Sequence, residues 1–131
     1  MIRIAIIGGI GSGKSFISKL FGYPVFNADN EVKYIYKKNR KCFNKLNKKL
    51  PKFIKTFPVR KEELILAINS NKKNLRLISS IVHPLVQESM KKFIKKNKNR
   101  KLVVLDIPLL IENKLNKKKR YNNFYSISQF K

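Results

Sequence analysis

The first fifteen residues constrain the fold of this chain more than any other segment. Residues Ile2–Ile7 form a short apolar run rich in β-branched side chains, which predicts a buried strand. The next eight residues, Gly8–Ser15, fit the pattern G-x-x-x-x-G-K-[ST] of a phosphate-binding loop. Glycines let such a loop approach an anion closely, and successive backbone N–H groups then point at it. This arrangement predicts an α/β protein that binds a phosphorylated ligand.

The residues of this loop have separate expected roles. Lys14 supplies a mobile cation for the β- and γ-phosphates of a nucleotide, and the Ser15 hydroxyl can ligate Mg²⁺. A helix expected over Lys14–Phe21 adds the positive end of its dipole. A secretory signal peptide is excluded, because the apolar run is too short and lacks a small-residue cleavage site. The predicted nucleotide-binding residues are Gly8, Gly9, Ile10, Gly11, Ser12, Gly13, Lys14 and Ser15.

The net charge of +24 is large for 131 residues and allows three interpretations. It could serve nucleic-acid or acidic-membrane binding, it could attract a polyanionic small molecule, or it could reflect compositional drift with a solvated basic face. Lysines are spread along the chain, with runs at 91–101 and 114–120 that lack the interleaved aromatic residues of a single-strand-binding surface. We favour compositional drift with a solvated basic face as the explanation of the charge, and we expect no nucleic-acid partner.

Composition also sets the expected location. No apolar stretch approaches the roughly 20 residues of a membrane span. The single cysteine, Cys42, cannot form an internal disulfide, which agrees with a reducing compartment. We therefore expect a cytoplasmic protein without a membrane partner, and the sequence leaves its oligomeric state open.

The chain has only two aspartates, Asp29 and Asp106, and each lies at the end of a predicted strand. Ligands of open α/β sheets bind outside the carboxyl ends of the strands, so both carboxyl groups are site candidates. Asp29 could orient and deprotonate an acceptor hydroxyl, or it could be the N-cap of the helix that follows. Asp106 could be an Mg²⁺-associated carboxylate, or it could cap a helix near Pro108.

Three further side chains are weaker candidates for substrate binding. His83 is the only histidine, and a packed or capping role competes with a functional one. Arg60 could contact a substrate phosphate or lie on a solvated face. Glu112 could organise an acceptor site or pair with a lysine. No second histidine or cysteine lies near enough in sequence to suggest zinc.

The remaining pattern predicts one domain, 1–131, with a three-layer α/β/α architecture, a parallel sheet and a helical insert over 38–100. Pro84 interrupts the long apolar stripe, so a kink or two helices meeting near His83 are expected there. The other expected elements are strands at Pro24–Asn27, Lys101–Asp106 and Tyr121–Ile127, and helices at Asn30–Lys37, Cys42–Leu50, Val59–Asn69, 74–97 and 107–116.

Five segments together resemble the dephospho-coenzyme A kinase family: I-I-G-G-I-G-S-G-K-S (6–15), N-A-D (27–29), V-R-K-E-E-L (59–64), H-P-L-V-Q (83–87) and D-I-P-L-L-I-E-N (106–113). The resemblance covers nearly the whole chain. It implies a P-loop kinase that uses ATP and Mg²⁺ to phosphorylate the 3′-hydroxyl of dephospho-coenzyme A, the last step of coenzyme A synthesis. It also implies Asp29 as the catalytic base, with Lys14 assisting. The alternatives are another small-molecule or nucleotide kinase, or an inactive remnant that only binds nucleotide.

The chain departs from the family pattern in three ways. The family commonly has Asp-Ala-Asp where Asn27 begins the corresponding triplet, and Thr where this chain has Phe16. The family also continues past the end of this sequence, into an arginine-bearing lid and a last strand. The tail S-I-S-Q-F-K (126–131) resembles the start of that segment. We therefore expect a C-terminally truncated member with weak activity or none.

Overall fold

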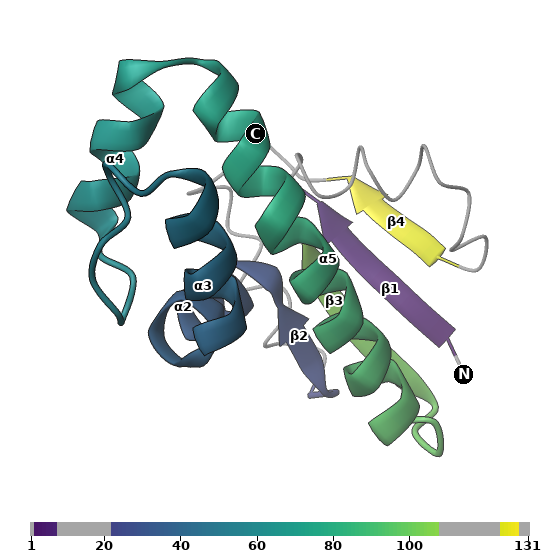
Figure 1. The fold of residues 1–131 in the computed structure, drawn as a ribbon. Coiled ribbons are helices and arrows are strands. Elements are labelled where there is room, and N and C mark those ends of the chain that lie inside the picture. The colour runs from purple at the N-terminus through teal and green to yellow at the C-terminus, as the bar shows by residue number, and fades with distance from the viewer. Residues whose placement is uncertain (1, 8–21, 108–123, 129–131) are drawn as a thin grey trace. The chain divides into compact units, whose positions relative to one another are not determined.

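The fold was obtained as a computed structural model, which describes residues 2–7, 22–107 and 124–128 (Figure 1). The predicted helix over Lys14–Phe21 lies outside these residues, as does the predicted helix 107–116 except for Ile107, which belongs to a strand. The described elements are β1 (Ile2–Ile7), β2 (Val25–Asn27), α2 (Ala28–Lys38), α3 (Arg40–Lys49), α4 (Lys61–Ser70), α5 (Lys73–Lys96), β3 (Leu102–Ile107) and β4 (Phe124–Ser128).

The chain divides into two compact units. The sheet unit comprises Met1–Asp29 and Ser89–Lys131, and the helical unit comprises Asn30–Glu88. Helix α5 contributes residues to both units. The helical unit is an insertion between β2 and β3 in chain order, as is the predicted segment 38–100, although its bounds differ.

The sheet has four parallel strands in the order β2-β3-β1-β4 (Figure 1). All six residues of β3 are buried, as expected for a central parallel strand, and all but Asp106 are apolar. Because the strands are parallel, the ends of β1, β2 and β3 meet at one edge, where Ile7 pairs with Ile107 and Asn27 pairs with Asp106. The α/β fold class with a parallel sheet is therefore confirmed.

Within the sheet unit, the last turns of α5 pack against β2. The rings of Phe26 and Phe93 lie 5.6 Å apart between centroids, and Met90 and Ile94 are buried on the same helix. Aromatic pairs at this separation stabilise a core beyond their simple area burial. This packing keeps β2 in place although the strand has only three residues.

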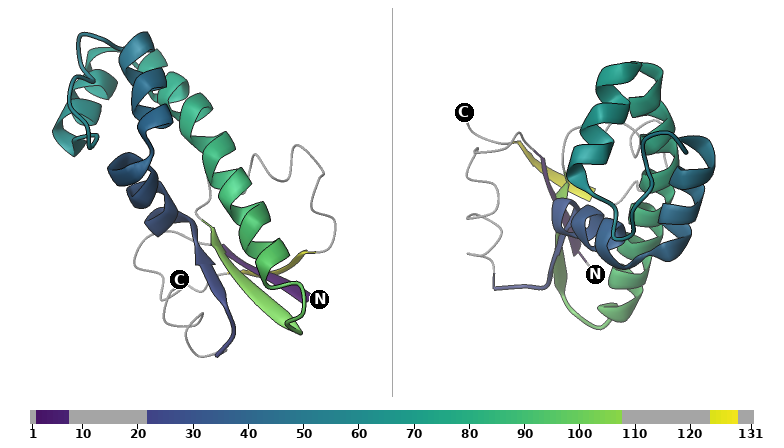
Figure 2. Two further views of the ribbon diagram at one scale, coloured as in Figure 1. Left: turned by 60° about the horizontal axis from the view of Figure 1, so that its bottom comes forward. Right: turned by 60° about the vertical axis from the view of Figure 1, so that its left-hand side comes forward.

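The helical unit contains α2 from Asn30 onward, α3, α4 and the first part of α5 (Figure 2). Helix α3 begins two residues before its predicted start at Cys42. The side chain of Asn39 accepts a 2.9 Å hydrogen bond from the Cys42 N–H and so caps the helix. Leu46 and Ile54 are fully buried in this unit. The ring of Phe57 packs against Phe43, with centroids 5.7 Å apart.

Helix α4 begins at Lys61, two residues later than the sequence predicts. The backbone N–H of Val59 donates a 3.0 Å hydrogen bond to the carbonyl of Tyr36, which is distant in sequence. Arg60 has an extended backbone, with φ −92° and ψ 136°. Because this hydrogen bond to Tyr36 holds Val59 outside the helix, the predicted start of α4 at Val59 was wrong.

Helix α5 is a single helix that includes Pro84, so of the two predicted alternatives near His83, a kink or two separate helices, the second was wrong. Proline removes the N–H that would bond to the carbonyl four residues earlier, which belongs to Ser80. Pro84 and Ser80 are both exposed, so water can solvate that carbonyl. The buried side chains run without interruption along the other face, and their burial favours one helix: Ile78, Val82, Val86, Met90 and Ile94.

Candidate active site

Two polar side chains meet at the carboxyl ends of neighbouring strands. Asp106 lies near the end of β3 and is 2% exposed, and Asn27 is the last residue of β2 and pairs with it in the register. The side-chain nitrogen Nδ2 of Asn27 donates a 3.0 Å hydrogen bond to Oδ2 of Asp106. These residues are 79 positions apart in the chain, so only the sheet topology brings them together.

This hydrogen bond explains how a carboxyl group is accommodated at a buried position. The Asn27 amide presents its nitrogen, which only donates, to an oxygen of this carboxyl group. Bonds to an ionised acceptor are roughly twice as strong as neutral ones, and a buried charge needs such partners. Asn27 was not among the site residues predicted from the sequence. The available signal was a polar residue at the end of a predicted strand, two positions before Asp29 in the N-A-D triplet.

Asp29 lies two residues beyond Asn27, at the same end of β2. Helix α2 begins at Ala28, so Asp29 belongs to its first turn and does not precede it. The N-cap interpretation of Asp29 was therefore wrong. The side chain is exposed, and the helix dipole favours a negative charge at this position. An exposed, ionisable carboxyl group at a strand end is able to meet a substrate hydroxyl.

The phosphate-loop motif starts in sequence directly after Ile7, the last residue of β1. Ile7 pairs with Ile107, the residue after Asp106. The loop itself, from Gly8 to Ser15 and including Lys14, lies outside the described residues, as does Glu112. The described sheet therefore brings the end of β1, from which the motif continues, to the edge that carries Asp106 and Asn27.

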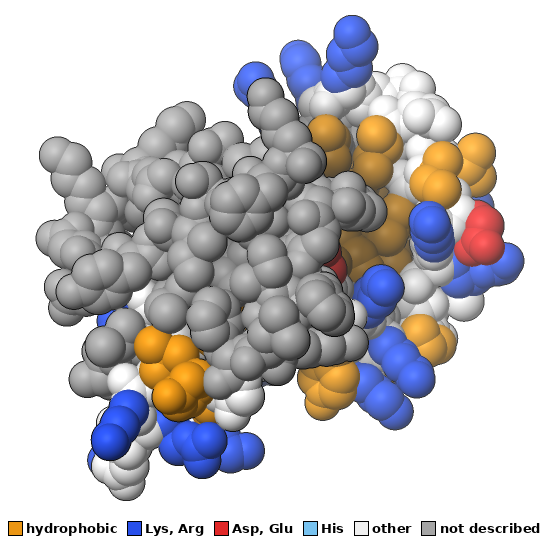
Figure 3. All heavy atoms as spheres, turned by 180° about the vertical axis from the view of Figure 1, so that it is seen from behind, with side chains coloured by type: hydrophobic (Ala, Val, Ile, Leu, Met, Phe, Trp, Pro, Cys, Tyr) orange, Lys and Arg blue, Asp and Glu red, His pale blue; other side chains and the backbone are white. Residues whose placement is uncertain are grey.

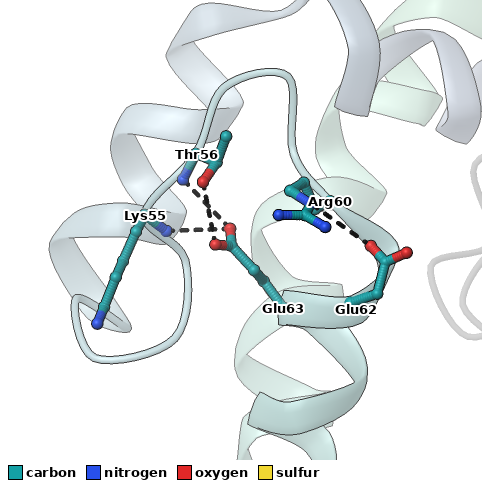
Figure 4. A network of polar contacts seen from close by, with 5 residues as sticks. All are labelled: Lys55, Thr56, Arg60, Glu62 and Glu63. Carbon is teal, nitrogen blue, oxygen red and sulfur yellow. Dashed lines mark hydrogen bonds and ion pairs between the residues drawn. The ribbon is translucent and has the colours of Figure 1, made fainter.

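The other two substrate-binding candidates belong to the helical unit. Arg60 directly precedes α4, and its Nε lies 3.6 Å from Oε2 of Glu62 in an exposed ion pair (Figure 4). Such pairs contribute little to stability. His83 is partly buried within α5. The sheet unit thus contains Asp29 and Asp106, whereas Arg60 and His83 lie in the other compact unit.

Glu63 is the most extensively bonded carboxylate in the helical unit among those with described contacts (Figure 4). Its Oε1 accepts bonds from the N–H groups of Lys55 and Thr56 at 3.1 and 3.2 Å, and its Oε2 accepts one from the Thr56 hydroxyl at 3.1 Å. Partial desolvation raises the pKa of Glu63, but these bonds and the nearby Arg60 charge outweigh it and hold the pKa below its ordinary value. This carboxylate fixes a loop and has a structural role.

Two buried groups of the helical unit have raised pKa values. Burial raises the pKa of the Cys42 thiol to about 11. Burial, and then the neighbouring Cys42, raise the pKa of Tyr36 to about 12. A thiol protonated at neutral pH is a poor nucleophile and a poor metal ligand. Cys42 therefore contributes to packing.

Lys and Arg side chains are scattered over the described part of the face in Figure 3. None of the described helices is long and apolar enough to cross a membrane. Within the described ranges, no three His, Cys, Asp or Glu side chains gather in a way that could hold a metal ion. A metal at Asp106 would need further oxygen ligands, such as the Ser15 hydroxyl and nucleotide phosphates, and Mg²⁺ is commonly held in this way.

Comparisons with known proteins agree with this arrangement. A curated dephospho-CoA kinase from Bartonella henselae is 40% identical over 117 residues, which is 85% of this chain and 59% of that protein. One from a Wolbachia strain of Brugia malayi is 39% identical over 114 residues, covering 83% of this chain and 58% of that protein. The crystal structure of TT1252 from Thermus thermophilus superposes with a TM-score of 0.71 at 28% identity, covering 89% of this chain and 61% of that one.

The chain spans about three fifths of the length of the curated relatives that it matches. The sequence profile of the dephospho-CoA kinase family matches residues 2–127, which is almost the entire chain. The parallel sheet, the phosphate-loop motif after β1 and the two aspartates at strand ends are all consistent with that match. The chain therefore belongs to the dephospho-CoA kinase family.

Proposed function

We propose that this protein transfers the γ-phosphoryl group of ATP to the 3′-hydroxyl of dephospho-coenzyme A and so forms coenzyme A. The observation that carries the proposal is the convergence of Asp106, Asn27 and Asp29 at the edge where β1 leads into the phosphate-loop motif. Family membership supports the same reaction, because the curated relatives are named dephospho-CoA kinases.

In this proposal the loop residues Gly8–Ser15 bind the ATP phosphates through their backbone N–H groups. The Lys14 ammonium neutralises charge on the β- and γ-phosphates as the transferred group separates from ADP. Most of the rate enhancement in phosphoryl transfer comes from such positioning and charge stabilisation. The loop is therefore proposed to position the phosphoryl donor and to neutralise its charge.

Asp29 has the role of general base. Its carboxylate accepts the proton of the 3′-hydroxyl while that oxygen forms a bond to the γ-phosphorus, and the bond from the γ-phosphorus to the bridging oxygen of ADP breaks. The exposed position of Asp29 in the first turn of α2 suits this role, because its carboxyl group is accessible to a bound substrate.

Asp106 and Ser15 are the residues that would hold Mg²⁺. The buried, amide-bonded carboxylate of Asp106 is a hard oxygen donor of the kind that Mg²⁺ prefers, so the residues fit this ion. When bound, Mg²⁺ supplies neutralisation of the phosphate charge. Asp106 acts by holding its carboxylate in a fixed orientation toward that site.

The helical segment 38–100 is proposed to lie on the substrate side of a single kinase domain. Arg60 and His83 in that segment, and Glu112 beyond it, are candidate contacts for the phosphate and ribose groups of dephospho-coenzyme A. The absence of long apolar segments in the sequence supports a cytoplasmic location.

The test is an assay of the purified chain with ATP, Mg²⁺ and dephospho-coenzyme A, followed by mass spectrometry of coenzyme A. ATP affinity is measured in parallel by calorimetry. We expect product formation to be slow, in line with the weak activity expected from the sequence. We also expect a loss of ATP affinity of at least tenfold in Lys14→Ala, because the phosphate-binding cation is removed. Lys91→Ala is the matched control, since Lys91 is an exposed lysine on α5.

Three results would contradict the proposal. Unchanged ATP affinity in Lys14→Ala would overturn the assignment of the loop. ATP binding with no phosphoryl transfer to dephospho-coenzyme A would favour a protein that only binds nucleotide. Faster transfer to a nucleoside monophosphate than to dephospho-coenzyme A would favour another small-molecule or nucleotide kinase.

A further inference from the structure

We propose that Asn27 is a positioning residue that fixes the Asp106 carboxylate for Mg²⁺ binding without placing a second carboxylate beside it. The inference rests on the proposed function. It goes beyond that function because it assigns a role to a residue that does not itself contact the reacting groups.

The contact is specific in its geometry. Asn27 and Asp106 occupy the same register position on adjacent parallel strands, and Nδ2 and Oδ2 lie 3.0 Å apart. Both residues belong to the sheet unit, and Asp106 is 2% exposed. Because each residue is held by its strand, the hydrogen bond does not depend on the conformation of a loop. The bond therefore restricts rotation of the carboxylate about its Cβ–Cγ axis.

The chemistry of the amide explains why asparagine suits this position. Its nitrogen donates to the carboxylate, whereas an aspartate at position 27 would place a second carboxylate at hydrogen-bonding distance from the first. Two carboxylates this close repel unless a proton or a cation lies between them. An alanine would leave the charge of the pair unchanged but would remove the restraint on orientation. The amide supplies restraint without additional charge.

Partners behind a metal ligand commonly set its orientation, and their loss typically lowers metal affinity by about 10–100-fold. We therefore expect Asn27→Ala to raise the Mg²⁺ concentration at half-maximal binding of a fluorescent ATP analogue by about 10–100-fold. Asn97→Ala is the matched control. Its Nδ2 donates at 2.8 Å to the backbone carbonyl of Phe93, so the variant removes a similar amide bond in the same unit, one made to a backbone carbonyl and not to a carboxylate.

A second measurement, which needs neither ATP nor activity, tests the charge argument. Urea unfolding at pH 7.5 without Mg²⁺ should give an unfolding equilibrium constant roughly 10–100-fold larger for Asn27→Asp than for wild type, because two carboxylates then face each other. Combining Asn27→Asp with Asp106→Asn exchanges the amide and the carboxylate. This double variant should return to within about threefold of the wild-type constant. It should not recover the wild-type Mg²⁺ response, because the carboxylate has moved to β2.

The outcomes separate this inference from the proposed function. A Mg²⁺ midpoint within twofold of wild type in Asn27→Ala would overturn the inference, as would a double variant no more stable than Asn27→Asp alone. If the wild-type chain does not bind ATP, both proposals are overturned. Normal Mg²⁺-dependent ATP binding without transfer to dephospho-coenzyme A would overturn the proposed function only, and the Asn27 variants would still decide the inference.

Discussion

One polar contact of the sheet unit and two of the helical unit differ in how far apart in the chain their partners lie. In the sheet unit, the contact between Asn27 and Asp106 joins residues 79 positions apart. In the helical unit, the contacts described above for Asn39 and Glu63 join residues at most eight positions apart. The first contact depends on strand pairing, and the others depend on the local course of the chain.

The long-range contact belongs to a candidate reaction site, whereas the local contacts cap a helix and fix a loop. Parallel strands bring their carboxyl ends to one edge, so residues from remote segments can act together there. Local side-chain bonds, in contrast, satisfy the N–H groups of helix starts and loops. Carboxylates of the two units should therefore respond differently to mutation: Asp29 through activity and Glu63 through stability.

The largest expected effect is that of Asp29→Asn. The amide keeps the shape of the side chain but cannot accept the proton, so kcat for coenzyme A formation should fall about 10²–10⁴-fold. ATP affinity and urea unfolding should stay near wild type, because Asp29 is exposed. Steady-state kinetics and calorimetry measure the two quantities. A fall in kcat of less than threefold would assign Asp29 to helix stabilisation.

Leu46→Ala should produce the largest loss of stability among these changes. Leu46 is fully buried in the helical unit, and removing such a side chain leaves a cavity that costs about 2–5 kcal/mol. The neighbouring helix α4 offers the control Leu66→Ala, since Leu66 is 61% exposed and should change the free energy of unfolding by less than about 1 kcal/mol. Equal effects in the two variants would show that α3 is not a core element.

Alkaline pH should weaken the helical unit through Cys42. Its pKa is raised from 9.0 to about 11, so the folded state keeps a proton that the unfolded state releases above pH 9. This contribution to stability is fully present below pH 9 and is lost as pH rises from 9 to 11. Urea unfolding at half-unit pH intervals should show a steeper decline for wild type than for Cys42→Ala. Parallel pH profiles would show that burial does not perturb the thiol.

Glu63→Gln should have the smallest effect, on stability alone. The neutral side chain weakens the charge-assisted bonds to Lys55 and Thr56, and the expected loss is about 1 kcal/mol because the bonds are exposed. Glu62→Gln is the matched control, because Glu62 makes only an exposed ion pair among its described contacts. Thermal unfolding compares the two variants. A loss of kcat in Glu63→Gln at unchanged stability would contradict the distinction between the units.

The sequence predicted the sheet unit well because its signals are local. Apolar runs marked β1 and β3, and aspartates marked the strand ends. It could not predict the partner of Asp106, because register depends on how remote strands align. It also missed the start of α4, where the carbonyl of Tyr36 accepts a hydrogen bond from Val59. A division into two helices at Pro84, one of two predicted alternatives, does not occur, because the lost hydrogen bond lies on the solvent side of α5.

The central claim is that a metal-bound nucleotide binds at the edge formed by the ends of β1, β2 and β3. The most direct test uses Mn²⁺ and ATP in place of Mg²⁺ and ATP, with NMR signals of the described backbone amides as the readout. The paramagnetic ion broadens the signals of nearby amides most strongly. Broadening should be greatest at Asn27, Asp106 and Ile107. It should decrease along β3 toward Leu102, which lies about 13 Å from Asp106 at 3.3 Å per residue. Equal broadening at both ends of β3, or greater broadening at Leu102, would contradict the account.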